Sequence, residues 1–83
     1  MPPLDPEELQ AIRQALGLDR AARPYRNHHV APADDPLAAR LVRRGLLRPG
    51  QVTAAGLVLF EVTMPGARLA GTTLAELEPS PPA

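Results

Sequence analysis

The residues with the most distinctive chemistry lie in the middle of the chain, between positions 20 and 50. This segment carries seven arginines and both histidines against two aspartates, a net charge of +5, although the whole chain of 83 residues is formally neutral. Guanidinium groups make forked hydrogen bonds with carboxylates and phosphates, so an arginine cluster is a candidate contact surface. The candidate partner-binding residues are Tyr25, Arg26, Asn27, His28, His29, Arg40, Arg43, Arg44 and Arg48.

Tyr25, Arg26 and Asn27 combine an amphipathic ring, a forked cation and a turn-forming amide. One interpretation is a recognition surface for a phosphate or for a carboxylate of a partner. The other is a structural lock, in which Tyr25 packs on the helices and Asn27 holds a turn. In that lock, Arg26 pairs with an acid such as Glu8 or Asp19. We favour the lock.

Arg40, Arg43, Arg44 and Arg48 form a basic stripe that can sit on phosphates or read guanine edges in the major groove of DNA. The same stripe can contact a protein, or it can be a solvated helix face whose cations interact favourably with the helix dipole. Non-specific affinity for DNA depends on a positive field, and this chain has no net charge. We therefore favour a protein partner over DNA.

His28 and His29, with Asp34 and Asp35, are the residues nearest to a metal-binding set. Adjacent histidines point apart in most backbones, the sequence has no cysteine, and the aspartates are placed to cap a helix. Nucleophilic catalysis has no better support, because the only serine is Ser80, near the end of the chain. We expect no metal, no cofactor and no enzymatic activity.

The arginine stripe lies on a helix that we predict over residues 35–47. Asp35 is a good N-cap, Pro36 suits the first helical position, and Gly45 is placed to end the helix. Leu41 and its apolar neighbours recur at helical spacing on the side opposite the arginines. One face of this helix is therefore expected to be buried in the core and the other to be exposed to solvent.

An earlier helix is predicted over residues 4–18, where Asp5 and Glu8 match a capping box and Gly17 is a stop signal. Its buried side is expected to carry Leu9, Ile12 and Leu16. Its side facing water is expected to carry Glu7, Glu8, Arg13 and Gln14.

Residues 19–34 show neither a helical nor a strand period, so we predict a long connection with room for one helical turn. Tyr25 and Val30 are its expected anchors to the core. Residues 51–53 and 57–63 have the pattern of the two strands of a β-hairpin, after which Thr63 is placed to cap a short helix.

A single domain is expected over residues 1–78, followed by a disordered tail at 79–83. Its core must consist of small aliphatic side chains, since Tyr25 and Phe60 are the only aromatic residues. The sequence contains no run of about 18 apolar residues and no signal-like start. We therefore expect a cytoplasmic protein that does not enter membranes, and homo-oligomerisation stays open.

Two segments, 41–48 (LVRRGLLR) and 62–69 (VTMPGARL), together with the hairpin between them, resemble the C-terminal half of a winged-helix domain of the MarR type. The resemblance implies that the helix before Gly45 is a recognition helix and that the hairpin is the wing. A regular helix-turn-helix also needs a helix ahead of the recognition helix. Pro24 and Pro32 leave little room for one.

Residues 24–31 (PYRNHHVA), with the segments 41–46 and 60–63, resemble a group of small phage and prophage proteins that share a YRNHF block. His29 stands where that group usually has an aromatic residue. The resemblance implies a viral accessory role.

The sequence therefore predicts a small α+β, winged-helix-like domain with two to four short helices and a β-hairpin. Its predicted function is that of a non-catalytic phage-type accessory protein that binds another protein. Such a protein can inhibit a host defence complex, as anti-CRISPR proteins do, or form part of a viral assembly. The alternative is a DNA-binding winged-helix regulator that uses the arginine face of residues 36–48.

Overall fold

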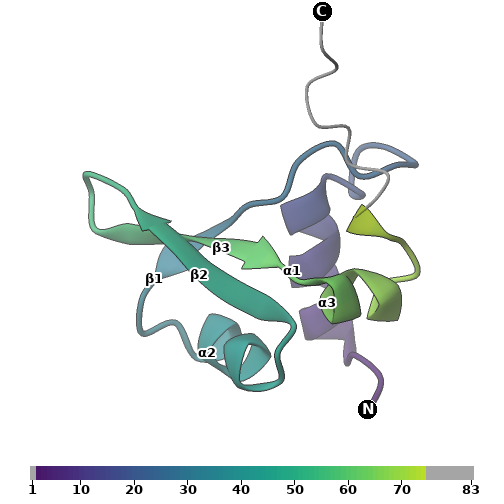
Figure 1. Ribbon diagram of the computed structural model, residues 1–83, viewed down its shortest axis with the longest axis horizontal. Helices are drawn as coiled ribbons and strands as arrows, with labels where there is room; N and C mark the ends of the chain where they lie inside the picture. The colour runs from purple at the N-terminus through teal and green to yellow at the C-terminus, as the bar shows by residue number, and fades with distance from the viewer. Residues whose placement is uncertain (1, 75–83) are drawn as a thin grey trace, which may run out of the picture.

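Three helices and three strands make up the fold, which the computed structural model describes for residues 2–74. In chain order they are α1 (Pro6–Leu16), β1 (His29–Pro32), α2 (Pro36–Arg43), β2 (Leu47–Val52), β3 (Leu57–Val62) and α3 (Met64–Leu69). The strands form one antiparallel sheet in the order β1-β3-β2. Figure 1 shows α1 and α3 side by side at one end of the sheet, α2 below it, and the β2–β3 turn projecting away from the helices. The α+β prediction is confirmed, and the arrangement is compatible with a winged-helix-like fold.

The starts of both longer helices follow from local capping chemistry. Oδ1 of Asp5 accepts a hydrogen bond from the Glu8 amide at 2.8 Å, and Oε1 of Glu8 accepts one from the Asp5 amide at 3.1 Å. Asp35 likewise accepts from the amide of Ala38 at 2.9 Å. Each carboxylate satisfies amides that have no partner within the helix, so the predicted N-caps are confirmed.

The helix that carries the arginines is shorter than predicted. α2 ends at Arg43, and Gly45 follows it with a φ of 74°. The amide of Leu46 donates to the carbonyl of Leu41 at 2.9 Å, which closes the helix. The stop signal at Gly45 is confirmed, but the bound at Leu47 was too late, because the apolar residues after Gly45 already turn toward the sheet.

Strand β1 was not predicted, and it replaces the helical turn expected before the proline at position 32. It pairs with β3 from His29 opposite Phe60 to Pro32 opposite Leu57. The expected anchors of this connection were also wrong, since Tyr25 is 54% exposed and Val30 is 50% exposed. Ala31 is buried instead, because it lies on the inner face of the strand.

The hairpin is confirmed, but its first strand begins earlier than predicted, at Leu47. The pairing of β2 with β3 is irregular between Pro49 and Val52. A proline is tolerated there because β2 is an edge strand. Residues 48–52 are exposed, so most of β2 projects as a wing that the helices do not cover.

One core holds the elements together. Its largest fully buried side chains are Ile12, Leu16, Leu41, Leu46 and Val62. They come from α1, from α2 and the turn after it, and from β3, so the core lies between the helices and the inner face of the sheet. Thr63 caps α3 as predicted, by accepting from the Gly66 amide at 3.3 Å.

Within residues 2–74, none of the helices combines the length and the apolar character that crossing a membrane requires. The predicted tail at 79–83, and the end of the predicted domain, lie outside the described residues.

Candidate functional site

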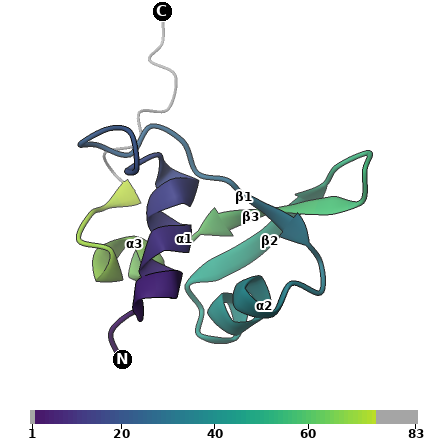
Figure 2. The ribbon, with the colours of Figure 1, turned by 180° about the vertical axis from the view of Figure 1, so that it is seen from behind.

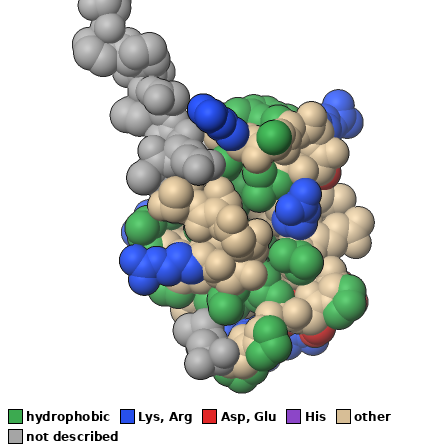
Figure 3. All heavy atoms as spheres, turned by 90° about the vertical axis from the view of Figure 1, so that its right-hand side faces the viewer, with side chains coloured by type: hydrophobic (Ala, Val, Ile, Leu, Met, Phe, Trp, Pro, Cys, Tyr) green, Lys and Arg blue, Asp and Glu red, His purple; other side chains and the backbone are tan. Residues whose placement is uncertain are grey.

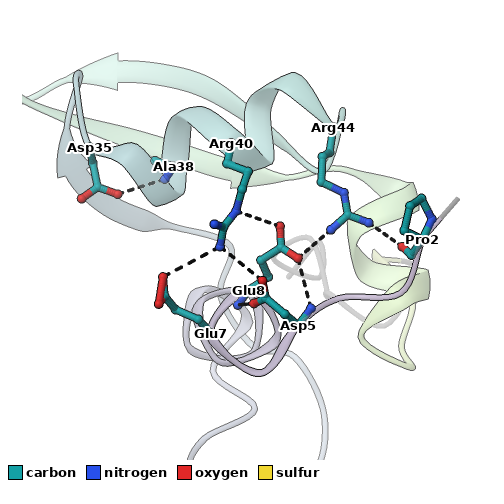
Figure 4. A network of polar contacts seen from close by, with 8 residues as sticks. All are labelled: Pro2, Asp5, Glu7, Glu8, Asp35, Ala38, Arg40 and Arg44. Atoms are coloured by element: carbon teal, nitrogen blue, oxygen red, sulfur yellow. Dashed lines mark hydrogen bonds and ion pairs between the residues drawn. The ribbon is translucent and has the colours of Figure 1, made fainter.

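The predicted arginine surface has a buried carboxylate at its centre. Glu8 is only 3% exposed, although the helical pattern placed it on the side facing water. Its Oε1 accepts a hydrogen bond from Nη1 of Arg44 at 2.6 Å, and its Oε2 accepts one from Nε of Arg40 at 3.3 Å. Figure 4 shows both guanidinium groups reaching from α2 to the first turn of α1. The expected position of Glu8 was wrong, because the guanidinium groups of Arg40 and Arg44 bond to its carboxylate.

Further contacts extend this ion-pair network. Nη2 of Arg40 lies 3.4 Å from Oδ2 of Asp5 and 3.8 Å from Oε1 of Glu7, and Nη2 of Arg44 donates to the carbonyl of Pro2 (Figure 4). The side chain of Arg40 is 43% exposed and that of Arg44 is 20% exposed. The prediction that the arginines face solvent was therefore wrong for Arg44, which is mostly buried, and only partly right for Arg40.

The charge state of Glu8 reflects two opposing effects. Burial alone raises the pKa of a carboxyl group, since it disfavours the charged form. The Asp5 amide and the hydrogen-bonded cation of Arg44 favour the charged form, and together they lower the pKa of Glu8 below its usual 4.5. Glu8 is therefore an anion at neutral pH and holds its two arginines by charge-assisted hydrogen bonds.

Arg43 and Arg48 lie apart from this network. Arg43 is exposed, and in the described part of the chain it makes no ion pair. Arg48 lies on β2 opposite Glu61 of β3, with Nη2 of the arginine 3.2 Å from Oε1 of the glutamate. The predicted stripe is thus divided, with Arg40 and Arg44 directed toward α1, Arg43 toward solvent and Arg48 toward its cross-strand acid.

Arg26 supports the interpretation of its segment as a lock. Its Nε and Nη2 both donate to the carbonyl of Gln14, at 3.1 and 2.8 Å, and Nη2 lies 3.6 Å from Oδ1 of Asp19. The carbonyl of Gln14 belongs to the last turn of α1, where cations and donors stabilise the helix end. The predicted pairing of Arg26 with Asp19 is confirmed.

Tyr25 lies against the left-handed residue that ends α1. A Cβ atom at Gly17, whose φ is 81°, would come within 2.3 Å of Cε1 of Tyr25. The amide of Tyr25 also donates to the carbonyl of Leu16 at 3.0 Å, and the guanidinium carbon of Arg26 lies 5.5 Å from the centre of the tyrosine ring. The ring covers the helix end while keeping half its surface in solvent.

Asn27 fastens the same segment to the sheet, so the expected role of holding a turn was wrong. Its Nδ2 donates to the carbonyl of Val62 at 3.2 Å, and its Oδ1 accepts from the amide of Val62 at 2.7 Å. The side-chain amide therefore takes the place of a further residue of β1 in the ladder with β3. The binding of a partner by these residues stays a prediction.

The two histidines have different surroundings. His28 is exposed, whereas His29 lies beside Phe60 with 6.3 Å between ring centres. Burial lowers the pKa of His29 below its usual 6.5, and the negative charge of Asp35 opposes that shift. Among residues 2–74, the structure brings together no three histidine, aspartate or glutamate side chains in a way that can hold a metal ion.

A groove that sequence reasoning missed lies beside β1. It has a volume of about 480 Å³ and is lined by Glu7, by residues 29–32 and by residues 35–37. A smaller hollow of about 180 Å³ lies on the opposite face of the sheet, between His28, Leu59 and Glu61. The groove depends on a strand that the sequence did not reveal, so no sequence signal pointed to it.

Comparisons of the chain with protein-family models, with curated proteins and with solved structures found no match.

Proposed function

We propose that this chain is a non-catalytic binding domain whose partner is a protein and not DNA. The observation that carries the proposal is the direction of the arginines on α2. In a winged-helix-like domain, α2 occupies the place of the recognition helix, and its basic side chains would have to point away from the domain to reach phosphates or bases. Arg44 instead points inward to Glu8, and Arg40 divides its contacts among the acids of α1, so that of these three arginines only Arg43 points to solvent.

The positive charge is scattered on the face of the molecule shown in Figure 3. On this face, arginine side chains lie apart from one another with apolar side chains between them. The chain as a whole has no net charge. Neutralising several neighbouring phosphates needs a continuous positive surface, so this distribution supports a protein partner. The viral accessory role implied by residues 24–31 stays a prediction within this proposal.

A DNA titration tests the proposal against its main rival. Fluorescence anisotropy of a labelled duplex is measured from about 20 to about 200 mM salt, and we expect no saturable binding even at the low end. A DNA-binding domain that contacts three or four phosphates would show a log–log salt slope of about −3.

The matched variants are Arg43→Ala on the exposed side of α2 and Arg23→Ala elsewhere on the surface. Saturable binding that is lost in the first variant and kept in the second would show that α2 reads DNA, and would overturn the proposal.

A second experiment tests for a protein partner. The chain is tagged and purified from nuclease-treated source cells, and we expect one other protein to co-purify with it in stoichiometric amount.

A further inference from the structure

We propose that the outer edge of β1 and the groove beside it bind an extended peptide segment of a partner protein, with an arginine or lysine next to a small apolar residue. This inference rests on the protein-binding function proposed above and names the surface and the kind of ligand. It follows from the direction of the backbone groups of β1, from the shape of the groove and from the charge of its lining.

The pairing of β3 sets the direction of the backbone groups along β1. Both backbone groups of Val62 bond to Asn27, so the amide and carbonyl of Val62 face β1. Backbone groups alternate along a strand, so those of Phe60 face β1 as well and pair with its partner residue, His29. The amide and carbonyl of Val30 must then point away from β3, at the open edge of the sheet.

The residues on either side of Val30 follow the same alternation. The amide of His28 points away from β3 and donates to the carbonyl of Ala15 at 3.0 Å. Pro32 has no amide hydrogen, and its carbonyl accepts from the amide of Asp35 at 3.0 Å. Val30 is therefore the residue of β1 whose two outward backbone groups can pair with another chain.

The groove lies directly beside this edge. Figure 2 shows β1 in front of the other strands, with α1 on one side and α2 below it. Ala31, Pro36 and Leu37 give the groove an apolar lining. Only residues 33–35 connect β1 to α2, and a regular helix-turn-helix would have its first helix in that connection. The groove is open because this chain has no such helix there.

The charged groups that line the groove are acidic. Glu7 stands on the α1 side and Asp35 on the α2 side, and no arginine is among the lining residues. Arg40 lies closer to Glu8 (3.3 Å) and Asp5 (3.4 Å) than to Glu7 (3.8 Å), so it compensates the charge of Glu7 only in part. Burial keeps the pKa of His29 below its usual value, so this side chain is largely neutral at pH 7. A ligand that enters the groove therefore gains by carrying a cation.

An extended peptide fits these features better than a helix or a second copy of the chain. A helix uses its backbone groups internally and cannot pair with Val30. A second copy that paired through its own β1 would bring another Glu7 and Asp35 to the acidic groove. In an extended peptide, the residue opposite Val30 forms the backbone pair and its neighbours point into the groove.

The probe is the blocked pentapeptide acetyl-Thr-Arg-Val-Ala-Thr-amide, with its central valine intended for the place opposite Val30. Amide chemical shifts of the ¹⁵N-labelled chain are followed during titration, and we expect the largest changes at Val30, Ala31 and Leu37. N-methylation of the central valine should weaken binding about tenfold or more, since it removes a ladder hydrogen bond. N-methylation of the following alanine, whose amide points away from β1, is the matched control.

Charge recognition is tested with Glu7→Gln combined with Asp35→Asn. Glu7 is exposed, and asparagine retains the N-cap of α2, so the fold should survive. The parent chain should bind the arginine peptide about tenfold more tightly than the same peptide with glutamate in place of arginine. In the double variant this preference should fall below about threefold.

Absence of shift changes along β1 at about 5 mM peptide would overturn the inference, as would binding that is indifferent to N-methylation of the valine. If a protein still co-purifies with the chain while these peptides fail to bind, the groove is not the docking site and the proposed function stands. If neither a partner nor a peptide binds, both proposals fail.

Discussion

Glu8 combines three structural roles in one side chain. It completes the capping box of α1, holds Arg44 and holds Arg40. A carboxylate that is 3% exposed is stable as an anion only when its oxygens are bonded to donors or cations, and both oxygens of Glu8 are. The burial of this residue therefore depends on the arginines that the sequence seemed to offer to a partner.

The first prediction concerns acid stability. Because the pKa of Glu8 is lower in the folded chain than its usual 4.5, the unfolded chain binds more protons as the pH falls through 4.5. The stability that Glu8 contributes is present above that pH and is lost as the pH falls through its folded pKa. Glu8→Gln should cost about 2 to 3 kcal/mol of unfolding free energy at pH 7.

Urea unfolding of both proteins at several pH values checks this. The difference in the free energy of unfolding between the parent and Glu8→Gln should become smaller as the pH is lowered from about 6 to about 3. Glu7→Ala, on the exposed side of the same turn, should change the free energy of unfolding at pH 7 by no more than about 0.5 kcal/mol. A pH-independent difference for Glu8→Gln would contradict the assigned role.

The second prediction concerns Asn27. Its side chain satisfies both backbone groups of Val62, so Asn27→Ala should lower the free energy of unfolding by about 1 to 3 kcal/mol. Asn27→Asp keeps the acceptor for the Val62 amide but places an oxygen against the Val62 carbonyl. It should not restore stability at pH 7. Chemical denaturation measures the free energy of unfolding of both variants. If Asn27→Ala is as stable as the parent, the hydrogen bonds between Asn27 and Val62 do not stabilise the fold.

At the scale of elements, α3 is placed by a close approach to the turn before β2. A Cβ atom at Gly66 would come within 2.5 Å of the carbonyl oxygen of Leu46. Gly66→Ala should therefore destabilise the chain by about 1 to 3 kcal/mol, even though alanine favours helix formation. Arg68→Ala on the exposed side of α3 is the matched control and should change stability by no more than about 0.5 kcal/mol. A stabilised Gly66→Ala protein, by thermal unfolding, would contradict this packing.

Elements with local signals were predictable from the sequence, and elements with distant partners were not. The N-caps Asp5, Asp35 and Thr63 act within their own first turns, so the sequence located all three helix starts. Strand β1 has only four residues and gains its regularity from β3, which comes much later in the chain. The groove beside it was therefore unpredictable as well.

At the scale of the whole molecule, the first turn of α1 and the arginines of α2 compensate each other's charge. Residues 1–19 carry four acidic residues against one arginine, and residues 20–50 carry a net charge of +5, but these counts do not reveal that Glu8 lies between Arg40 and Arg44. Helical periodicity positions residues around one helix and does not say which neighbouring helix will cover them. The basic surface was overestimated for that reason.

A double-mutant cycle between Glu8 and Arg44 tests the central claim most directly, namely that Arg44, at the end of α2, is held inside the domain by Glu8. The free energies of unfolding of Glu8→Gln, Arg44→Met and the double variant are compared with that of the parent. The control cycle uses Glu8→Gln, Arg43→Met and their double variant. We predict a coupling of about 2 kcal/mol for Glu8 with Arg44 and about zero for Glu8 with Arg43. A coupling below about 0.5 kcal/mol for Arg44, or an equal one for Arg43, would contradict the claim and return the arginines of α2 to the surface.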